Sequence, residues 1–357
     1  MQIEIIQPSE IDDGLATAWR ALQASDPDLG GPFFTPDFAR IVGRVRPDAR
    51  VAVVRDGPDV SGVFTYHRQR FGRLAPLAGQ ISDYHGLVAR PGHHIDMRAI
   101  LRAAEAQAFD FNHVPRSQAG FVPHAYRDTT SPLVDLRDGF DAWFADKSAQ
   151  NRSFRDLARR TRKLERQHGP VRLVANDTSR ATWDTFMDWK RAALAAAGAG
   201  YILDTGWAGD IARAIRDTDT PEFGGMTSAL WAGDTLVAVH FGMRSARRLH
   251  WWFPSYSHAH AKMSPGLIQI VEMLRHLDAQ GFEELDFGRG EQRYKRDFMN
   301  AERPLLEGSL ERPASLMGVP RRLRKGLQAA ANRLPSPKVP EFTRRAGDRL
   351  LGAGRLT

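Results

Sequence analysis

Apolar and polar residues in the first half of the chain alternate between strand-like and helix-like spacing. Residues 51–68 contain two β-rich runs on either side of a Gly-Pro turn, and residues 97–109 continue with a helical pattern. The run SPLVDL from Ser131 predicts another strand, and residues 139–168 are predicted to be helical after it. The first half therefore begins as a mixed α/β structure.

A very basic stretch lies between Asn151 and Gly169, inside this predicted helical region. Phe154, Leu157, Thr161 and Leu164 recur at intervals of three and four residues and so form one face of a helix. The Arg and Lys side chains occupy the other face. We interpret the basic face as solvated, and the alternative is contact with an anionic donor. The segment is predicted to connect two halves of the chain.

The second half begins with a strand and two helices and continues with three strands. The predicted strand covers residues 171–175, the helices 178–198 and 207–217, and the later strands 226–232, 235–243 and 247–254. Short turns separate these three strands, which predicts an antiparallel meander. A helix then begins at Ser264-Pro265-Gly266 and ends at Gly281, and the strand EELDFG follows it. The fold class is therefore α/β (α+β), with largely antiparallel mixed sheets flanked by helices.

Length and composition narrow the range of functions. The 357 residues are enough for two domains, and the absence of cysteine excludes disulfides, a thiolate nucleophile and cysteine-ligated metals. No apolar stretch approaches the roughly 20 residues of a spanning helix. The N-terminus has no basic start followed by an apolar core, so a cytoplasmic location is expected.

The positive charge of the chain is concentrated in a C-terminal tail. Residues 312–357 contain eleven Lys or Arg residues and two acids, so the other residues have a net charge of −1 although the whole chain has +8. The apolar residues of 312–357 recur at helical spacing. Such a tail could rest on an anionic membrane surface, dock on the body, or bind a phosphate-bearing regulator such as cyclic di-GMP. If the tail rests on a membrane surface, the protein would be peripheral at the inner membrane. Specific DNA binding is not expected.

Two passages carry a resemblance to a known family. They are ISDYHGLVAR from Ile81, and the stretch from Tyr256 to Phe298 with its SPG helix start, Gly-x-x-x-x-Asp-Phe-Gly-x-Gly turn and Tyr294-Lys295. They resemble GNAT-superfamily acetyltransferases of the CelD-like group, from cellulose and exopolysaccharide biosynthesis clusters, which are related to the FemAB peptidoglycan aminoacyltransferases. The resemblance implies two tandem GNAT-like halves, 1–150 and 151–311, followed by the tail 312–357. It also implies acetyl-CoA as acyl donor and an amine acceptor, often on a sugar.

Donor-binding residues are expected at the start of the helix after the meander. The usual Arg/Gln-x-x-Gly-x-Gly/Ala pyrophosphate loop of the superfamily is absent, and its counterpart contains Lys262, Ser264 and Gly266. A helix N-terminus presents free N–H groups to phosphate. The alternative is that Ser264 only caps the helix. Arg289 and Lys295 are further candidates for donor binding.

Asp286, Tyr294 and His240 are the candidate catalytic residues. Asp286 ends a strand before a glycine-rich turn and could take the proton of the attacking amine, or pair with Arg289, Arg293 or Lys295 and hold the turn. Tyr294 could protonate the departing thiolate or simply pack. His240 lies in an alternating strand and is either a residue lining a cleft or a satisfied core histidine.

In the first half, Asp83, Tyr84 and His85 precede Gly86 in a turn and are expected to face the acceptor. No metal site is predicted, because the histidine pairs lack carboxylates at suitable spacing. The leading hypothesis is an N-acyltransferase that acts on an exopolysaccharide or its precursor. The alternatives are a FemAB-like transferase that uses aminoacyl-tRNA, and a non-catalytic GNAT-fold effector regulated through its tail.

Overall fold

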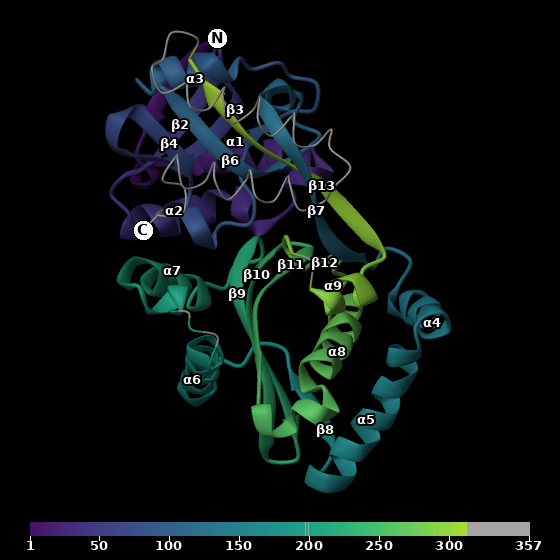
Figure 1. The fold of residues 1–357 in the computed structure, drawn as a ribbon. Helices are drawn as coiled ribbons and strands as arrows, with labels where there is room; N and C mark the ends of the chain where they lie inside the picture. Colours follow the sequence, from purple (N-terminus) through teal and green to yellow (C-terminus); the bar gives the residue numbers. More distant parts are fainter. Residues whose placement is uncertain (197, 199, 291, 313–357) are drawn as a thin grey trace. The chain divides into compact units, whose positions relative to one another are not determined.

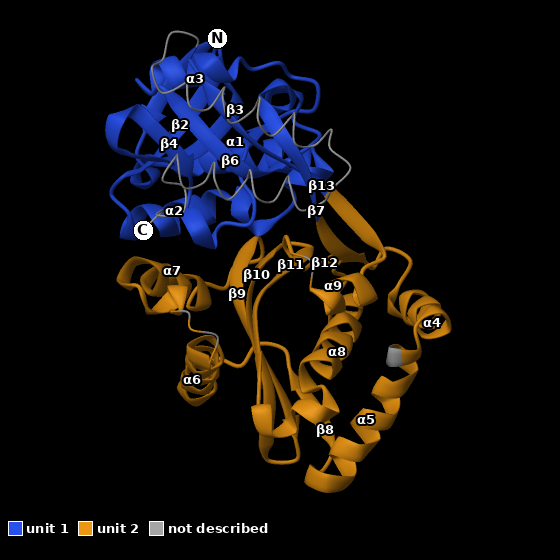
Figure 2. Cartoon of the chain, viewed as in Figure 1, with its two compact units in different colours: residues 1–130, 304–357 blue, residues 131–303 orange. Residues whose placement is uncertain are grey.

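A computed structural model describes residues 1–196, 198, 200–290 and 292–312, which fall into two units (Figure 2). The first unit contains residues 1–130 together with the described residues from Pro304 onward, and the second contains Ser131–Arg303. No helix among the described residues is long and apolar enough to cross a membrane. The predicted tail lies outside the described residues from 313 onward.

The first unit is built on a mixed sheet. Its elements are β1 (Gln2–Ile6), α1 (Asp13–Ala24), α2 (Pro36–Val45), β2 (Ala49–Asp56), β3 (Asp59–Arg68), β4 (Arg73–Pro76), β5 (Leu87–Ala89), α3 (Met97–Ala103), β6 (Ala108–Pro115), the 3-10 helix η6 (Ala119–His124) and the start of β7 (Ala125–Asp135). The strand order is β1-β2-β3-β4-β6-β13, with β5 beside β3. All these pairs are antiparallel except β4 with β6.

The second unit holds the meander predicted from sequence. Its elements are α4 (Phe140–Gln150), α5 (Arg152–His168), β8 (Val171–Val174), α6 (Arg180–Ala196), α7 (Gly206–Arg216), β9 (Phe223–Ala232), β10 (Thr235–Ser245), β11 (Arg248–Tyr256), the 3-10 helix η8 (His258–Met263), α8 (Pro265–Ala279), β12 (Glu284–Asp286), α9 (Arg293–Phe298) and β13 (Ala301–Glu311). Its strand order is β7-β12-β11-β10-β9-β8. Helices α6 and α7 cover one side of the meander, and α8 covers the other (Figure 1).

The order of elements in the first unit is repeated in the second. Each has a strand, two helices, three antiparallel strands, a helix, a strand, a short helical segment and a last strand, apart from the additional strand β5 in the first unit and the helices α4 and α5 that precede the second copy. The last strand of each copy pairs in the other unit. Leu133–Asp135 of β7 pair with β12, and Leu305–Glu311 of β13 pair with β6. The mixed α/β fold with largely antiparallel sheets is confirmed.

These pairings also locate the unit boundaries, which differ from the expected limits at 150 and 311. Helix α4 contacts α5 and α8, so it belongs to the second unit. The strand β13 changes unit between Arg303 and Pro304 because it pairs with β6 from Leu305 onward.

Two local predictions needed correction. The helix expected over 97–109 ends at Ala103, because Glu105 has a φ of 53° and the chain enters β6 at Ala108. The helical region 139–168 is divided at Asn151, whose backbone is extended. The predicted apolar face is confirmed, because Phe154, Leu157 and Leu164 are buried.

Candidate functional site

The strands β11 and β12 of the second unit pair in parallel over a short distance and then separate. Their register runs from Arg248 opposite Glu284 to His250 opposite Asp286, where β12 ends. The strand β11 continues to Tyr256, and η8 leads from there to the start of α8. The part of β11 that pairs with β10 but not with β12 therefore joins two clusters of candidate residues, one around Asp286 and one around Ser264.

Asp286 is held by several donors at the point where the strands separate. Its Oδ1 accepts hydrogen bonds from Ser131 Oγ at 3.0 Å and from the Gly288 backbone N–H at 2.6 Å. Its Oδ2 accepts from Arg303 Nη1 at 2.8 Å. Arg303 is thus a charged partner of Asp286, and it is not among the cations that the sequence suggested, which were Arg289, Arg293 and Lys295. These donors use much of the accepting capacity of the carboxylate.

Arg303 connects Asp286 to a larger buried charge cluster. Its Nη2 donates to Glu284 Oε2 at 2.7 Å, and Arg248 Nε lies 3.6 Å from the same oxygen. His250 Nδ1 lies 3.8 Å from Asp286 Oδ1, and the His250 side chain is buried. Two carboxylates and two guanidinium groups balance one another, which is the arrangement that a buried ionic cluster requires.

Lys295 holds the turn after β12. Its Nζ donates to the backbone oxygen of Gly288 at 3.1 Å and to that of Arg289 at 3.0 Å, and the side chain is buried. Asp286 and Lys295 therefore brace the two sides of the same turn. The close approach depends on Gly290, which has a φ of 147°, because a Cβ there would come within 3.1 Å of Lys295 Nζ.

Tyr294 lies beside this turn, at the start of α9. Its ring meets Phe287 edge to face, with the ring centroids 5.9 Å apart. Burial raises the pKa of Tyr294 to about 12. The hydroxyl therefore keeps its proton at neutral pH.

The start of α8 carries Ser264 in a left-handed conformation, with a φ of 54°. Its carbonyl accepts from the N–H groups of Leu267 and Ile268, but its side chain does not cap the helix. Instead, Ser264 Oγ accepts a hydrogen bond of 2.7 Å from Arg160 Nη1 on α5. Gly266 follows at the helix start, and Lys262 is exposed in the last turn of η8. The basic helix α5 thus reaches the predicted donor residues.

His240 is packed in the core of the second unit. Its ring stacks on Trp251 with centroids 3.5 Å apart, and its Nε2 accepts from the Trp252 N–H at 3.2 Å. Nδ1 lies 3.4 Å from Ser228 Oγ. Burial lowers the pKa of His240 well below its usual value, with smaller contributions from His250 and Lys190. This geometry agrees with a satisfied core histidine.

The turn that contains Asp83, Tyr84 and His85 lies in the first unit. Tyr84 packs between Phe33 and Phe34, with centroid distances of 6.1 and 6.2 Å. His85 Nε2 accepts from the Asn112 N–H at 3.2 Å, so this neutral ring carries its proton on Nδ1. Burial lowers the pKa of His85 well below its usual value, with a smaller effect from His113. These contacts give Tyr84 and His85 packing roles within the unit.

Sequence reasoning did not single out Ser131, His250 or Arg303 at the Asp286 cluster, nor Arg160 at the start of α8. His250 interrupts the apolar run of β11, a signal that could have been noticed. No local sequence pattern marks Arg303, because Asp286 and Glu284, the residues it contacts, lie on another strand, β12. In the part of the chain that the structure describes, no three His, Asp or Glu side chains are grouped to hold a metal ion.

A family model described as Acetyltransferase (GNAT) domain matches residues 151–296. Known structures with the same fold include FemX, with 10% sequence identity and a TM-score of 0.59 over 87% of this chain and 96% of that one. L-PGS from Bacillus licheniformis has 14% identity and a TM-score of 0.54 over 89% and 97%.

The C-terminal domain of a putative lysylphosphatidylglycerol synthetase from Agrobacterium fabrum has 12% identity and a TM-score of 0.51, over 81% of this chain and 90% of that one. No curated protein matches the chain in sequence. Residues 151–296, which form most of the second unit, therefore match a GNAT acetyltransferase domain, and the prediction of a GNAT-type acyltransferase is confirmed.

Proposed function

We propose that this chain is an N-acyltransferase that moves an acetyl group from acetyl-CoA onto an amino group of an exopolysaccharide or its precursor. The observation that carries the proposal is the separation of β11 from β12. Between His250 and Tyr256 the strand β11 has no β12 partner, a distance of about 20 Å at roughly 3.3 Å per residue. An extended donor can lie along this segment, with phosphates at the start of α8 and the thioester near Asp286.

The reaction needs a proton acceptor and a proton donor but no covalent intermediate. The amine nitrogen attacks the thioester carbonyl carbon, a C–N bond forms and the C–S bond breaks. The ammonium proton passes to a base, and the departing thiolate receives a proton. The chain has no cysteine to form an acyl-enzyme.

His250 is better placed than Asp286 to be the base. The oxygens of Asp286 already accept from Ser131, Gly288 and Arg303, which leaves little room for a substrate proton. His250 adjoins Asp286 on the neighbouring strand, with 3.8 Å between Nδ1 and Oδ1. In this proposal Asp286 positions the ring of His250, and His250 takes the proton.

Tyr294 is the proposed acid. Its pKa of about 12 keeps the hydroxyl protonated, and no hydrogen bond within the described residues occupies it. A thiolate that leaves beside the turn after β12 can therefore receive this proton.

Acetyl-CoA binding tests the donor, and Arg160 provides the variant. Arg160→Ala is expected to weaken acetyl-CoA binding about tenfold in calorimetry, because a charge-assisted contact at the phosphate end is lost. Arg159→Ala is the matched control on the same helix, since Arg159 is exposed and lies 3.6 Å from Asp156. Absence of acetyl-CoA binding by the unmodified chain would refute the proposal. Transfer to glucosamine, followed by mass spectrometry, tests the acceptor.

The exposed basic face of α5 favours a second candidate, an aminoacyl-tRNA donor. Arg162, Lys163 and Arg166 are exposed there. For an RNA donor, replacing all three by alanine should weaken binding strongly and reduce its salt dependence by about three counterion contacts. For acetyl-CoA the same variant should change affinity by less than about threefold.

A further inference from the structure

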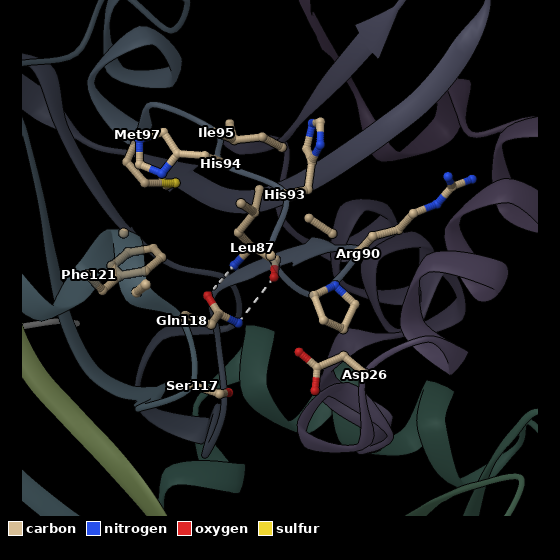
Figure 3. Close-up of a pocket in the computed structure, with 15 residues that line it drawn as sticks. Asp26, Leu87, Arg90, His93, His94, Ile95, Met97, Ser117, Gln118 and Phe121 are labelled. Carbon is tan, nitrogen blue, oxygen red and sulfur yellow. Dashed lines mark hydrogen bonds between the residues drawn. The ribbon is translucent and has the colours of Figure 1, made fainter.

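A cavity of about 140 Å3 lies entirely among residues of the first unit. Its walls come from β5, from the segment before α3 and from the segment that follows β6, together with Asp26 after α1 (Figure 3). None of these residues has a role in the proposed transfer site. The cavity therefore needs an explanation of its own.

One wall of the cavity is apolar and the other is polar. Ile95, Met97 and Phe121 are almost completely buried and supply the apolar wall with Leu87. Figure 3 shows Met97 and Ile95 at one side and the side chains of Asp26 and Ser117 at the opposite side. Ligand sites commonly combine an apolar lining with a few fixed polar groups.

Gln118 is the fixed polar group. Its Oε1 accepts from the Leu87 N–H at 2.9 Å, and its Nε2 donates to the Leu87 carbonyl at 3.1 Å (Figure 3). Gly86 makes room for the amide, because a Cβ there would come within 2.6 Å of Gln118 Oε1. The orientation of the amide is therefore set, and one N–H and one lone pair remain for a ligand.

Asp26 contributes a carboxylate without a cationic partner among the described residues. Its Oδ1 accepts from the Asp28 N–H at 2.9 Å, which leaves Oδ2 available. Three basic residues line the cavity: Arg90 and His93 are directed elsewhere, and His94 lies near Met97 in Figure 3, on the side opposite Asp26. The guanidinium of Arg90 points away from Asp26 in Figure 3, and His93 Nε2 lies 3.3 Å from Asp56 Oδ2. The cavity thus offers a hydrogen-bond acceptor suited to an ammonium or to hydroxyl groups.

The start of α3 differs in charge from the corresponding helix start in the second unit. In that order α3 corresponds to α8, whose start is basic because of Arg160. The start of α3 is instead capped by Asp96, whose Oδ1 accepts from the Arg98 N–H at 2.9 Å. A carboxylate already uses the positive end of this helix and repels a second anion. The start of α3 therefore offers no counterpart of the phosphate site proposed at the start of α8.

We propose that this cavity binds one amino-sugar ring, with the amino or hydroxyl groups on Asp26 and Gln118 and the C–H face on the apolar wall. Cavities of about 150 Å3 hold benzene, so this one can hold one face of a six-membered ring, while the ring substituents extend past the exposed Ser117 at its rim. The choice of an amino sugar rests on the proposed function, whereas the site itself does not. It gives the first unit a saccharide-binding role.

Calorimetry of the full chain with glucosamine, without any acyl donor, tests the proposal. Glucosamine is expected to bind, Asp26→Asn to weaken binding about tenfold, and Ser117→Trp to block it by filling the exposed rim. Asp59→Asn is the matched control, because Asp59 is an exposed acid outside the cavity, and it should leave binding unchanged.

Two results would overturn the proposal: no heat from glucosamine, or equal binding by Asp26→Asn and by the unmodified chain. Asp26→Asn and Ser117→Trp should both bind acetyl-CoA as tightly as the unmodified chain does. Failure of the saccharide site is therefore distinguishable from failure of the proposed acyl transfer.

Discussion

Arg303 offers the sharpest test of the site geometry. Only 8% of its side chain is exposed, and it donates to Asp286 at 2.8 Å and to Glu284 at 2.7 Å, whose side chains are 7% and 10% exposed. Arg303→Ala removes the guanidinium that Asp286 and Glu284 share, and Arg248 remains beside Glu284. Breaking a buried ion pair from one side costs about 3–5 kcal/mol of unfolding free energy, because an uncompensated charge stays in the interior.

Urea unfolding followed by circular dichroism measures this effect, and Arg137→Ala is the control. Arg137 also pairs with an aspartate of the second unit, Asp135, but 73% of its side chain is exposed. An exposed pair contributes about 0–1 kcal/mol. The loss of unfolding free energy in Arg303→Lys should fall between these two values, because lysine keeps the positive charge but cannot contact both carboxylates as the guanidinium does. Equal unfolding free energies for Arg303→Ala and Arg137→Ala would refute the reasoning.

Three further predictions concern titration and the tail. Burial raises the pKa of Tyr294 to about 12, so the hydroxyl loses its proton at lower pH in the unfolded chain than in the folded one, and stability should fall as pH rises from about 10 to 12. Tyr294→Phe should lessen that fall in alkaline unfolding experiments, and an identical fall in both proteins would contradict the prediction. Burial lowers the pKa of Lys190 to about 8, so the unfolded chain binds this proton at higher pH than the folded one, and stability should fall as pH decreases from about 10.5 to 8. Lys190→Met should therefore raise Tm at pH 7 and have little effect on Tm near pH 10.5. Of the three roles open to the tail, binding of cyclic di-GMP predicts that removing residues 313–357 abolishes that binding in calorimetry, and unchanged affinity would exclude this role.

The α8 region shows how far local patterns reach. The apolar spacing and the Ser-Pro-Gly start predicted a helix from Ser264 to Gly281, and the structure places α8 at Pro265–Ala279. The role of Ser264 was not predictable, because its hydroxyl contacts Arg160, which is 104 residues away. Proline at the first turn and the apolar stripe are local signals, whereas this contact depends on how α5 packs.

Asp286 shows the same division at the other end of β11. Its place at a strand end before a glycine turn follows from the sequence, and so does the importance of that turn. The partner of the carboxylate does not follow from it, because the nearest cations in sequence are Arg289, Arg293 and Lys295. Arg303, which does contact Asp286, lies 17 residues further along the chain, on β13.

Local patterns along the chain predicted most of the helices, the meander, the basic tail and the resemblance to the GNAT superfamily, because apolar periodicity, caps and turn residues act over a few neighbouring positions. Tertiary structure decided three further features: the exchange of last strands between the two units, the buried cluster around Arg303, and the cavity beside Asp26. Each of these brings together residues from distant parts of the chain, and such contacts leave no periodic mark on the sequence.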